Sequence, residues 1–477
     1  MSSYLPAPVV TNLGDGFYDP VLPARFPTHR LRFRNQRWAE HVGLGNLDDM
    51  AWEDHFAKFS PLIGNLESPL ALRYHGHQFG VYNPALGDGR GFLFAQLRDD
   101  DGRLLDLGTK GSGQTPWSRG GDGRLTLKGG VREVLATEML EALGVPTSKS
   151  FSLFETGEML FRGDEPSPTR SSVLVRLSHS HVRFGSFQRH AHARDLPRLE
   201  RLLEYAIEHY TPEARGASGL EARALAFVAA ASRKSAHLAA SFMAAGFVHG
   251  VLNTDNMVIT GESFDYGPYR FLPTYDPSFV AAYFDETGMY AFGRQPTVML
   301  WNVARLAEAL RPLAPDGDFR AALQSFEDTF HSAMQSRFLA RLGLASRGVD
   351  EDARLVDAIF GFLDLAKGLG YERFFFDWYG GMTREGHALA GQAKAHYAGG
   401  AFDNFRSAIA HYAAKRPEAL DHPYFAGDAP CTLLIDEIES IWSAIDERDD
   451  WAPFESKIAA IRTMGAAIEA SVPIISI

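Results

Sequence analysis

Cysteine is nearly absent from this sequence: Cys431 is the single cysteine among 477 residues. One cysteine excludes a disulfide bond within the chain and a metal site built from several thiolates. Long hydrophobic runs are absent too, since no apolar stretch reaches the roughly 18 residues of a membrane-spanning helix. The segment from Met1 to Pro6 lacks the basic flank and apolar run of a secretion signal. We therefore expect a cytoplasmic protein without a membrane partner.

Positive charge is scarce as well. The 59 acidic residues outnumber the 47 lysines and arginines, which gives a formal net charge of −12. A nucleic-acid-binding surface requires clustered Lys and Arg that neutralise phosphates, so we expect no nucleic-acid partner. The chain is long enough for two or three domains or for one enzyme with two lobes, and we expect a monomer.

Glycines and short β-type runs mark the part of the chain between residues 71 and 185. The runs 92–98 and 104–110 flank a polar turn, which predicts a hairpin. Apolar residues at helical spacing predict one helix over 125–143. Further strands are expected over 150–160 and 172–177, and the preceding proline-rich segment is expected to be irregular apart from one helix over 47–59.

Helical patterns dominate after residue 185. An Ala- and Leu-rich helix is predicted over 222–245, and it ends at Gly246 directly before a polar loop. A small β-rich part with one helix, followed by a larger helical part, is the order of lobes in protein kinases. We therefore predict an α+β fold of the bilobal protein-kinase type. Its predicted units are an N-terminal extension over 1–70, a β-rich N-lobe over 71–185, a helical C-lobe over 186–380 and a helical C-terminal region over 381–477.

The loop after the 222–245 helix has the layout of a kinase catalytic loop with one part missing. Compared with the kinase pattern H-R-D-L-x-x-x-N, the stretch from His249 to Asn256 keeps the His and the Asn but has Val251 where the catalytic Asp belongs. A D-Y-G triplet that begins at Asp265 follows nine residues after Asn256, as the metal-binding D-F-G segment does in kinases. The usual base for a protein hydroxyl is therefore missing, while both metal ligands are present.

Four residues supply the metal ligands and the ion pair that phosphate chemistry requires. Asn256 and Asp265 offer the hard oxygen ligands that suit Mg²⁺, which leaves other coordination positions open for substrate phosphates. Lys110 ends a predicted strand and Glu133 lies on the following helix, which matches the Lys and Glu that kinases pair at the phosphates. This combination favours transfer of a phosphoryl or nucleotidyl group.

Glycines and arginines surround this lysine in the sequence. Glycines at 87–91, 111–113 and 120–123 allow backbone N–H groups to approach phosphate oxygens closely. Arg176 and Arg183 lie seven residues apart around a predicted strand end, where their guanidinium groups can bind phosphate through two hydrogen bonds.

A set of long motifs in this sequence resembles those of one known family. The longest is K-G-S-G-Q-T-P-W-S-R-G-G-D-G-R over 110–124. Others are H-G-H-Q-F-G over 75–80, L-G-D-G-R over 86–90, H-G-V-L-N-T-D-N over 249–256 and D-Y-G over 265–267. These motifs are similar to those of the SelO (YdiU) pseudokinases, and the resemblance covers about residues 70–380.

The resemblance implies an enzyme. SelO proteins have a kinase-like fold, bind ATP in a reversed orientation and transfer its AMP to Ser, Thr or Tyr hydroxyls of other proteins, releasing pyrophosphate. Transfer of UMP from UTP is also associated with the family. The resemblance implies Mg²⁺ or Mn²⁺ as the cofactor and Asp255 as the base. By motif, Asn256 and Asp265 would hold the metal, Glu133 would pair with Lys110, and the nucleotide would contact Gly87, Gly89, Arg90, Lys110, Asp122, Gly123, Arg176, Arg183 and Asp265.

Two features depart from the family. Gly129 and Gly130 stand where hydroxyl residues usually precede the helix that carries Glu133, which predicts the loss of a helix cap. Beyond about residue 380 the usual family tail is not recognised, so a divergent helical region is expected there. Two alternatives to nucleotidyl transfer stay open: a phosphotransferase that uses Asp255 as a displaced base, and an inactive nucleotide-binding scaffold.

Overall fold

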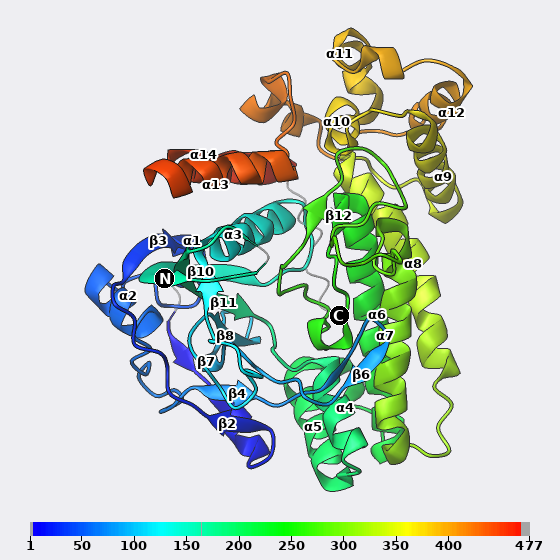
Figure 1. Ribbon diagram of the computed structural model, residues 1–477. Helices are drawn as coiled ribbons and strands as arrows, with labels where there is room; N and C mark the ends of the chain where they lie inside the picture. Colours follow the sequence, from blue (N-terminus) through cyan, green and yellow to red (C-terminus); the bar gives the residue numbers. More distant parts are fainter. Residues whose placement is uncertain (1–2, 164, 469–477) are drawn as a thin grey trace.

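A computed structural model describes residues 3–163 and 165–468, and Figure 1 shows their arrangement. One antiparallel sheet has the strand order β2-β4-β7-β8-β11-β10-β3, with β1 paired to β7 and β9 paired to β11. The sheet together with many helices confirms the predicted α+β class. The strands of the sheet are β1 (Leu5–Pro6), β2 (Tyr18–Pro20), β3 (Arg30–Arg34), β4 (Leu70–Leu72), β7 (Leu93–Arg98), β8 (Leu104–Lys110), β9 (Leu125–Thr126), β10 (Lys149–Leu160) and β11 (Thr169–Ser178).

The predicted hairpin, now β7 and β8, lies at the centre of this sheet beside β11 and β10. Every residue of β8 is buried, because helices cover both faces of the sheet. Helix α3 (Leu127–Ala142) packs on one face through residues such as Leu135. Helix α2 (Asp49–Phe56) covers the other face, where the Trp52 ring stacks on Phe151 with a centroid distance of 5.1 Å. The sheet is therefore a rigid base for the residues at its strand ends.

The first 70 residues are more ordered than their sequence pattern predicts. The helix expected over 47–59 is present as α2, but β2 and β3 also form the two ends of the sheet and β1 pairs with β7. These strands are short, and two of them contain proline, so they carry little local signal. Their pairing depends on partners far along the chain, such as β10 for β3.

Helix α3 has the N-terminal cap that the sequence was expected to lack. The side-chain oxygen of Thr126 accepts a hydrogen bond from the backbone N–H of Gly129 at 3.1 Å. The prediction of a lost cap is therefore wrong, because Thr126 supplies it from three residues before the glycine. A methyl group on Gly130 would lie 2.5 Å from the Leu153 side chain, so close packing explains why this position is a glycine.

Replacing Thr126 by alanine is expected to lower the free energy of unfolding by about 1 kcal/mol, the usual contribution of an N-cap side chain. Urea denaturation monitored by circular dichroism measures the loss of stability as a lower urea concentration at the midpoint of unfolding. Thr126→Ser keeps the hydroxyl and should retain most of the stability. An alanine variant as stable as the wild type would show that the 3.1 Å bond contributes nothing.

The second half of the chain is helical, and α6 (Leu220–Ala245) is its central helix, packed between α7 and α8. It ends as predicted at Gly246, whose φ of +61° suits glycine. The other helices here are α4 (Phe184–His192), α5 (Leu196–Tyr210), α7 (Gln295–Leu310), α8 (Arg320–Arg341), α9 (Val349–Leu365), α10 (Tyr371–Asp377), α11 (Glu385–Ala390) and α12 (Gly400–Ile409); two small ribbons pair β5 (Gly76–Gln78) with β6 (Val81–Asn83) and β12 (Phe247–Val248) with β13 (Arg270–Phe271).

The last two described helices, α13 (Ile435–Arg448) and α14 (Ala452–Ile468), return to the part of the protein that contains the sheet (Figure 1). Helix α14 packs on α3, where Arg462 Nε lies 2.7 Å from Glu138 Oε2. The boundaries predicted at residues 70, 185 and 380 stay predictions. Within the described ranges, none of the helices combines the length and the hydropathy that a bilayer span requires.

Candidate active site

Lys110 and Glu133 meet in the interior of the protein. Lys110 is the last residue of β8, and its Nζ forms an ion pair with the carboxylate of Glu133 from the middle of α3. The same Nζ lies 2.7 Å from Asp265 Oδ1. All three side chains are largely withdrawn from solvent, so the Lys110 ammonium group is held between two carboxylates.

Asp265 is the centre of a cluster of cations. Arg176 Nη1 from β11 lies 3.3 Å from Asp265 Oδ1, and Arg183 Nη1 lies 3.9 Å from Oδ2. Burial by itself raises the pKa of this carboxyl, but Lys110, Arg176 and Arg183 outweigh burial and hold the pKa well below its usual range. Asp265 has a φ of +68°, a backbone conformation rare for residues other than glycine. Asp265 is therefore a carboxylate at any ordinary pH.

Aromatic rings hold the two arginines in place. The Phe264 ring centroid lies 5.0 Å from the guanidinium carbon of Arg176 and 4.7 Å from that of Arg183. The Tyr74 ring centroid also lies 4.3 Å from the guanidinium carbon of Arg183. A guanidinium group packed against aromatic rings loses little freedom when it binds phosphate, because its plane is already restricted.

Asp255 is a second, separate carboxylate beside this cluster. It lies in a 3-10 turn (Thr254–Asn256), where Arg183 Nη1 donates a 2.7 Å hydrogen bond to its backbone carbonyl. Burial raises the pKa of the Asp255 carboxyl to about 6. Gln78 Nε2 approaches Oδ2 at 3.4 Å, while the buried Oδ1 has no hydrogen-bond partner within the described residues. One oxygen atom of Asp255 therefore has no hydrogen bond among the described residues that would stabilise its negative charge.

Asn256 and Asp265 fit the requirements of a divalent cation. Asn256 Nδ2 donates a 2.8 Å hydrogen bond to the Val251 carbonyl, which leaves Oδ1 of Asn256 as the atom that can bind a metal. Oδ2 of Asp265 keeps only the long 3.9 Å approach of Arg183 among its ion pairs in the described chain. A neutral oxygen and a carboxylate oxygen are ligands that Mg²⁺ prefers.

The glycines predicted to contact a nucleotide have packing roles. A methyl group on Gly87 would lie 2.4 Å from the Trp117 ring, and one on Gly89 would lie 2.8 Å from the Trp117 carbonyl. Arg90 is placed beside the cluster, because Gly111 N–H donates to its carbonyl and its charge helps to lower the pKa of Asp265.

Asp122 and Gly123 are not brought into contact with the cluster. Asp122 Oδ2 forms a 2.8 Å ion pair with Arg162 Nη1, and its side chain is partly exposed. Gly123 has a φ of +69°, and its carbonyl accepts a hydrogen bond from Gly113 N–H. Their nucleotide-binding role stays a prediction.

Four residues of the cluster were not predicted from the sequence: Tyr74, Gln78, Asp88 and Phe264. Asp88 Oδ1 lies 3.2 Å from Arg183 Nη2 and thereby binds the second terminal nitrogen of the guanidinium group. Phe264 directly precedes Asp265, so its position next to the D-Y-G triplet could have indicated from the sequence that it belongs to the site. Tyr74, Gln78 and Asp88 lie beside or within quoted motifs, but nothing local indicates which distant side chain each contacts.

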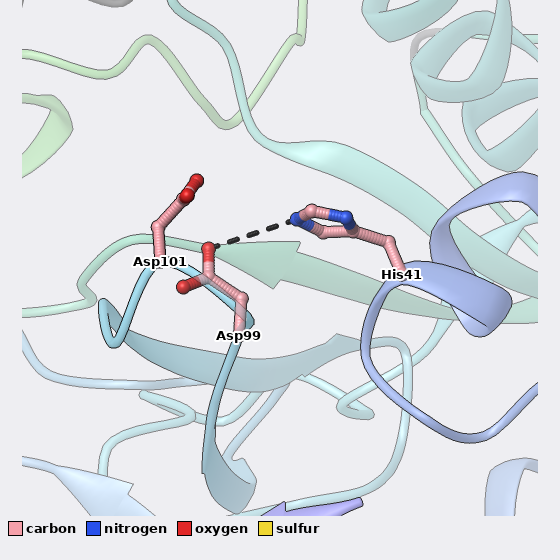
Figure 2. Close-up of side chains that lie close together, drawn as sticks. All are labelled: His41, Asp99 and Asp101. Carbon is pink, nitrogen blue, oxygen red and sulfur yellow. Dashed lines mark ion pairs between the residues drawn. The ribbon is translucent and has the colours of Figure 1, made fainter. Parts of the chain in front are cut away.

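A different group of side chains satisfies simple metal-site geometry, namely His41, Asp99 and Asp101 (Figure 2). His41 Nε2 lies 3.8 Å from Asp99 Oδ2. Asp99 already binds Arg103, whose Nε donates to Oδ2 at 2.7 Å. Asp99 is the one buried carboxylate of this group, and Arg103 neutralises it. The group therefore does not favour a bound cation.

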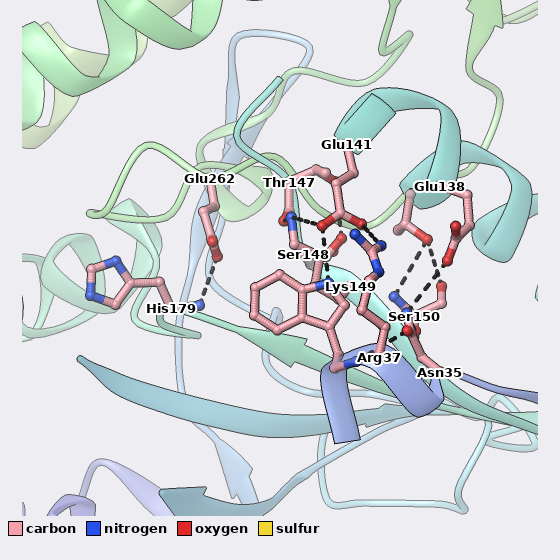
Figure 3. Close-up of polar contacts among 12 residues, drawn as sticks. Asn35, Arg37, Glu138, Glu141, Thr147, Ser148, Lys149, Ser150, His179 and Glu262 are labelled. Atoms are coloured by element: carbon pink, nitrogen blue, oxygen red, sulfur yellow. Dashed lines mark hydrogen bonds and ion pairs between the residues drawn. The ribbon is translucent and has the colours of Figure 1, made fainter. Parts of the chain in front are cut away.

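A cavity of about 1640 Å³ has none of the predicted site residues in its described lining. Figure 3 shows polar groups of this region, which contact one another. Arg37 Nη2 lies 2.5 Å from Glu141 Oε2, and His179 N–H donates to Glu262 Oε2 at 2.7 Å. Charge and geometry, and not volume, therefore identify the cluster around Asp265 as the candidate active site.

Comparison with known proteins extends the resemblance to nearly the whole chain. A family profile described as Protein adenylyltransferase SelO matches residues 3–462. A protein nucleotidyltransferase YdiU from Gloeobacter violaceus is 46% identical over 462 residues, which cover 95% of this chain and 94% of the relative. The protein of the same name from Synechocystis sp. is 44% identical over 469 residues, 96% of this chain and 97% of the relative.

A more distant relative of the same name, from Vibrio cholerae, is 39% identical over 341 residues, 70% of this chain and 67% of the relative. The expectation that the resemblance ends near residue 380 is wrong, because the matched profile continues to residue 462. Helix α13 and the first part of α14, up to residue 462, thus fall within the matched profile, and both helices contact α3. From the matched profile and these identities, the chain belongs to the SelO family.

Proposed function

We propose that this protein is a protein adenylyltransferase that transfers AMP from ATP to Ser, Thr or Tyr hydroxyls of other proteins. The observation that carries the proposal is that the cluster of cations around Asp265 and the carboxylate of Asp255 are separate neighbours. Lys110, Arg176 and Arg183 gather around Asp265, while Asp255 lies beside them with one carboxylate oxygen that has no hydrogen-bond partner among the described residues. Membership of a family described by adenylyl transfer supports the same reaction.

The proposal includes a kinase-like arrangement of two lobes. An ion pair between a strand lysine and a helix glutamate, as Lys110 and Glu133 form, is the kinase arrangement at the phosphates. The Asn256 and Asp265 loops follow the long helix α6 and lie opposite the sheet end that carries Lys110. The contacts of Lys110 with Glu133 and Asp265 therefore support a kinase-like arrangement of two lobes.

The cations suit a pyrophosphate leaving group. Lys110, Arg176 and Arg183 are buried, so each neutralises phosphate charge more strongly than it would in water. With the β- and γ-phosphates among them, the α-phosphate would face Asp255. Asn256 and Asp265 would hold Mg²⁺ or Mn²⁺, which when bound neutralises phosphate charge and orients the phosphate oxygens.

Asp255 would act as the general base. Its carboxylate accepts the proton of the acceptor hydroxyl while the hydroxyl oxygen forms a bond to the α-phosphorus. The bond from this phosphorus to the bridging oxygen breaks, and pyrophosphate leaves with the electron pair. Asp255 then releases the proton to solvent. The same steps apply to UMP transfer from UTP.

Labelled ATP tests the proposal. The protein is incubated with Mg²⁺, a protein extract and ATP that is labelled at either the α- or the γ-phosphate. We expect protein-bound label from α-labelled ATP alone. Label from γ-labelled ATP alone would instead establish a phosphotransferase, and no transfer from either would leave a nucleotide-binding scaffold. Repeating both incubations with UTP shows whether UMP is also a donor.

A further inference from the structure

Aromatic and aliphatic side chains are exposed together close to the candidate base. Tyr283 and Phe284 are 83% and 46% exposed, and on the β5–β6 ribbon Val81 and Phe79 are 70% and 37% exposed. The ring centroids of Phe79 and Phe284 are 6.0 Å apart, and those of Tyr283 and Phe284 are 5.1 Å apart. We call these four residues the aromatic surface. Exposed rings in contact with one another, as the three rings are here, mark a binding surface more often than isolated apolar residues do.

The aromatic surface is continuous with the loop that carries Asp255. Phe79 N–H donates to Asn253 Oδ1 at 3.3 Å, two residues before Asp255. The Tyr290 ring lies 4.8 Å from Phe79 by centroid, and its hydroxyl binds Asn253 at 2.5 Å. Gln78, the neighbour of Phe79, contacts the Asp255 carboxylate itself at 3.4 Å. The aromatic surface therefore contacts the loop that carries Asp255, and a target side chain bound to this surface would lie close to Asp255.

The backbone holds Phe79 outward at a cost in conformational energy. Its φ is +50°, in the left-handed region that residues other than glycine rarely occupy. Such strain costs on the order of 1–3 kcal/mol and is concentrated at functional sites. Packing of the ribbon alone does not require an exposed phenylalanine here, since a glycine or asparagine adopts this conformation more easily.

A basic hollow extends this surface. A depression of about 530 Å³ is lined by Thr287, Met289, Arg294, Thr297 and Val298. A Cβ atom placed on Gly80, at the tip of the β5–β6 ribbon, would lie 3.8 Å from Met289 Cε, so the hollow adjoins the ribbon. Arg294 is exposed, and its Nη1 donates to two backbone carbonyls without an ion pair among the described residues. An acidic side chain would complement it.

From this geometry we infer that the aromatic surface binds an extended segment of the target protein. The segment has a large apolar or aromatic side chain within a few residues of the acceptor hydroxyl, and an acidic side chain beyond it, over Arg294. This inference rests on the proposed adenylyl transfer and specifies which acceptors it favours. The apolar contact would select the segment, and Asp255 would meet its hydroxyl.

Synthetic acceptor peptides test the apolar contact. A set of peptides with one central serine has either phenylalanine or alanine at each position from one to four residues on both sides. The rate constant kcat/KM for α-label incorporation is measured with the full-length wild type, Phe284→Ser and Phe161→Ser. Phe161 is 76% exposed and lies outside the aromatic surface, which makes it the matched control.

We expect the wild type to prefer phenylalanine over alanine by about tenfold at one or two positions, the scale of burying an aromatic ring. Phe284→Ser should reduce this preference to less than about threefold, and Phe161→Ser should keep it. Titration with ATP verifies that each variant is folded. Equal rates for phenylalanine and alanine peptides, or an unchanged preference in Phe284→Ser, would overturn this inference alone. Absence of α-label from every peptide and protein acceptor would overturn the proposed function and the inference with it.

Charge reversal tests the acidic part. Peptides that carry Asp or Lys beyond the favoured apolar position are compared with the wild type and Arg294→Glu. We expect the wild type to prefer Asp and the variant to prefer Lys, with both preferences weakening as salt is added. The same order of preference in both proteins would show that Arg294 does not contact the segment.

Discussion

Replacing Asp255 by asparagine is expected to lower kcat for AMP transfer by two to four orders of magnitude, the usual contribution of a general base. Asparagine has nearly the same shape but cannot accept the hydroxyl proton. The position tolerates the exchange, because the backbone carbonyl and not the side chain of Asp255 binds Arg183, at 2.7 Å. Single-turnover incorporation from α-labelled ATP into a mixed protein acceptor measures the effect on chemistry directly.

A measurement of ATP binding distinguishes a variant that has lost only the base from one that has lost the nucleotide-binding site. Asp255→Asn should bind ATP and Mg²⁺ with nearly wild-type affinity, because the predicted phosphate ligands are Lys110, Arg176 and Arg183. Asp101→Asn, an exposed carboxylate on the turn between β7 and β8, is the matched control and should transfer AMP at the wild-type rate. Full activity of Asp255→Asn would rule out its role as the base.

Local signals were sufficient to predict the parts of the site that neighbouring residues determine. The two short β-type runs around a polar turn and the helical spacing of α3 predict the strand that carries Lys110 and the helix that carries Glu133. The two side chains meet when α3 packs on β11, because Lys110 ends β8, the strand that pairs with β11. The end of α6 at Gly246 likewise places the His249 loop where it was expected.

Contacts between distant segments could not be predicted in this way. Arg183 is held by Tyr74 and Asp88, about a hundred residues earlier, through a stacking contact and an ion pair that leave no periodic pattern. The packing of α14 on α3 includes the pair between Arg462 and Glu138, which lie 324 positions apart. The cap of α3 comes from Thr126, three residues before Gly129, and not from the positions of Gly129 and Gly130 at which the family usually has hydroxyl residues.

Replacing Asp265 by asparagine is expected to remove the effect of Mg²⁺ on nucleotide binding and to lower the transfer rate by on the order of 10³, as loss of a central electrostatic contact does. In the wild type the carboxylate offsets the charges of Lys110, Arg176 and Arg183. Asparagine leaves these cations in excess, so metal-free ATP should bind the variant at least as tightly as the wild type. Isothermal titration of ATP in Mg²⁺ and in EDTA measures both affinities.

The same substitution should destabilise the free protein, because Arg176 has its ion pair in the described structure with Asp265 alone. Breaking a buried pair costs roughly 3 kcal/mol at the low end of the measured range, which applies here because the Asp265 side chain is 25% exposed. ATP in EDTA should restore much of this loss, since its phosphates replace the missing charge. Asp88→Asn is the control: it removes another carboxylate from Arg183 and should leave the response to Mg²⁺ intact. If Asp265→Asn responds to Mg²⁺ as the wild type does, Asp265 serves only to balance the cations, and the metal must be held elsewhere.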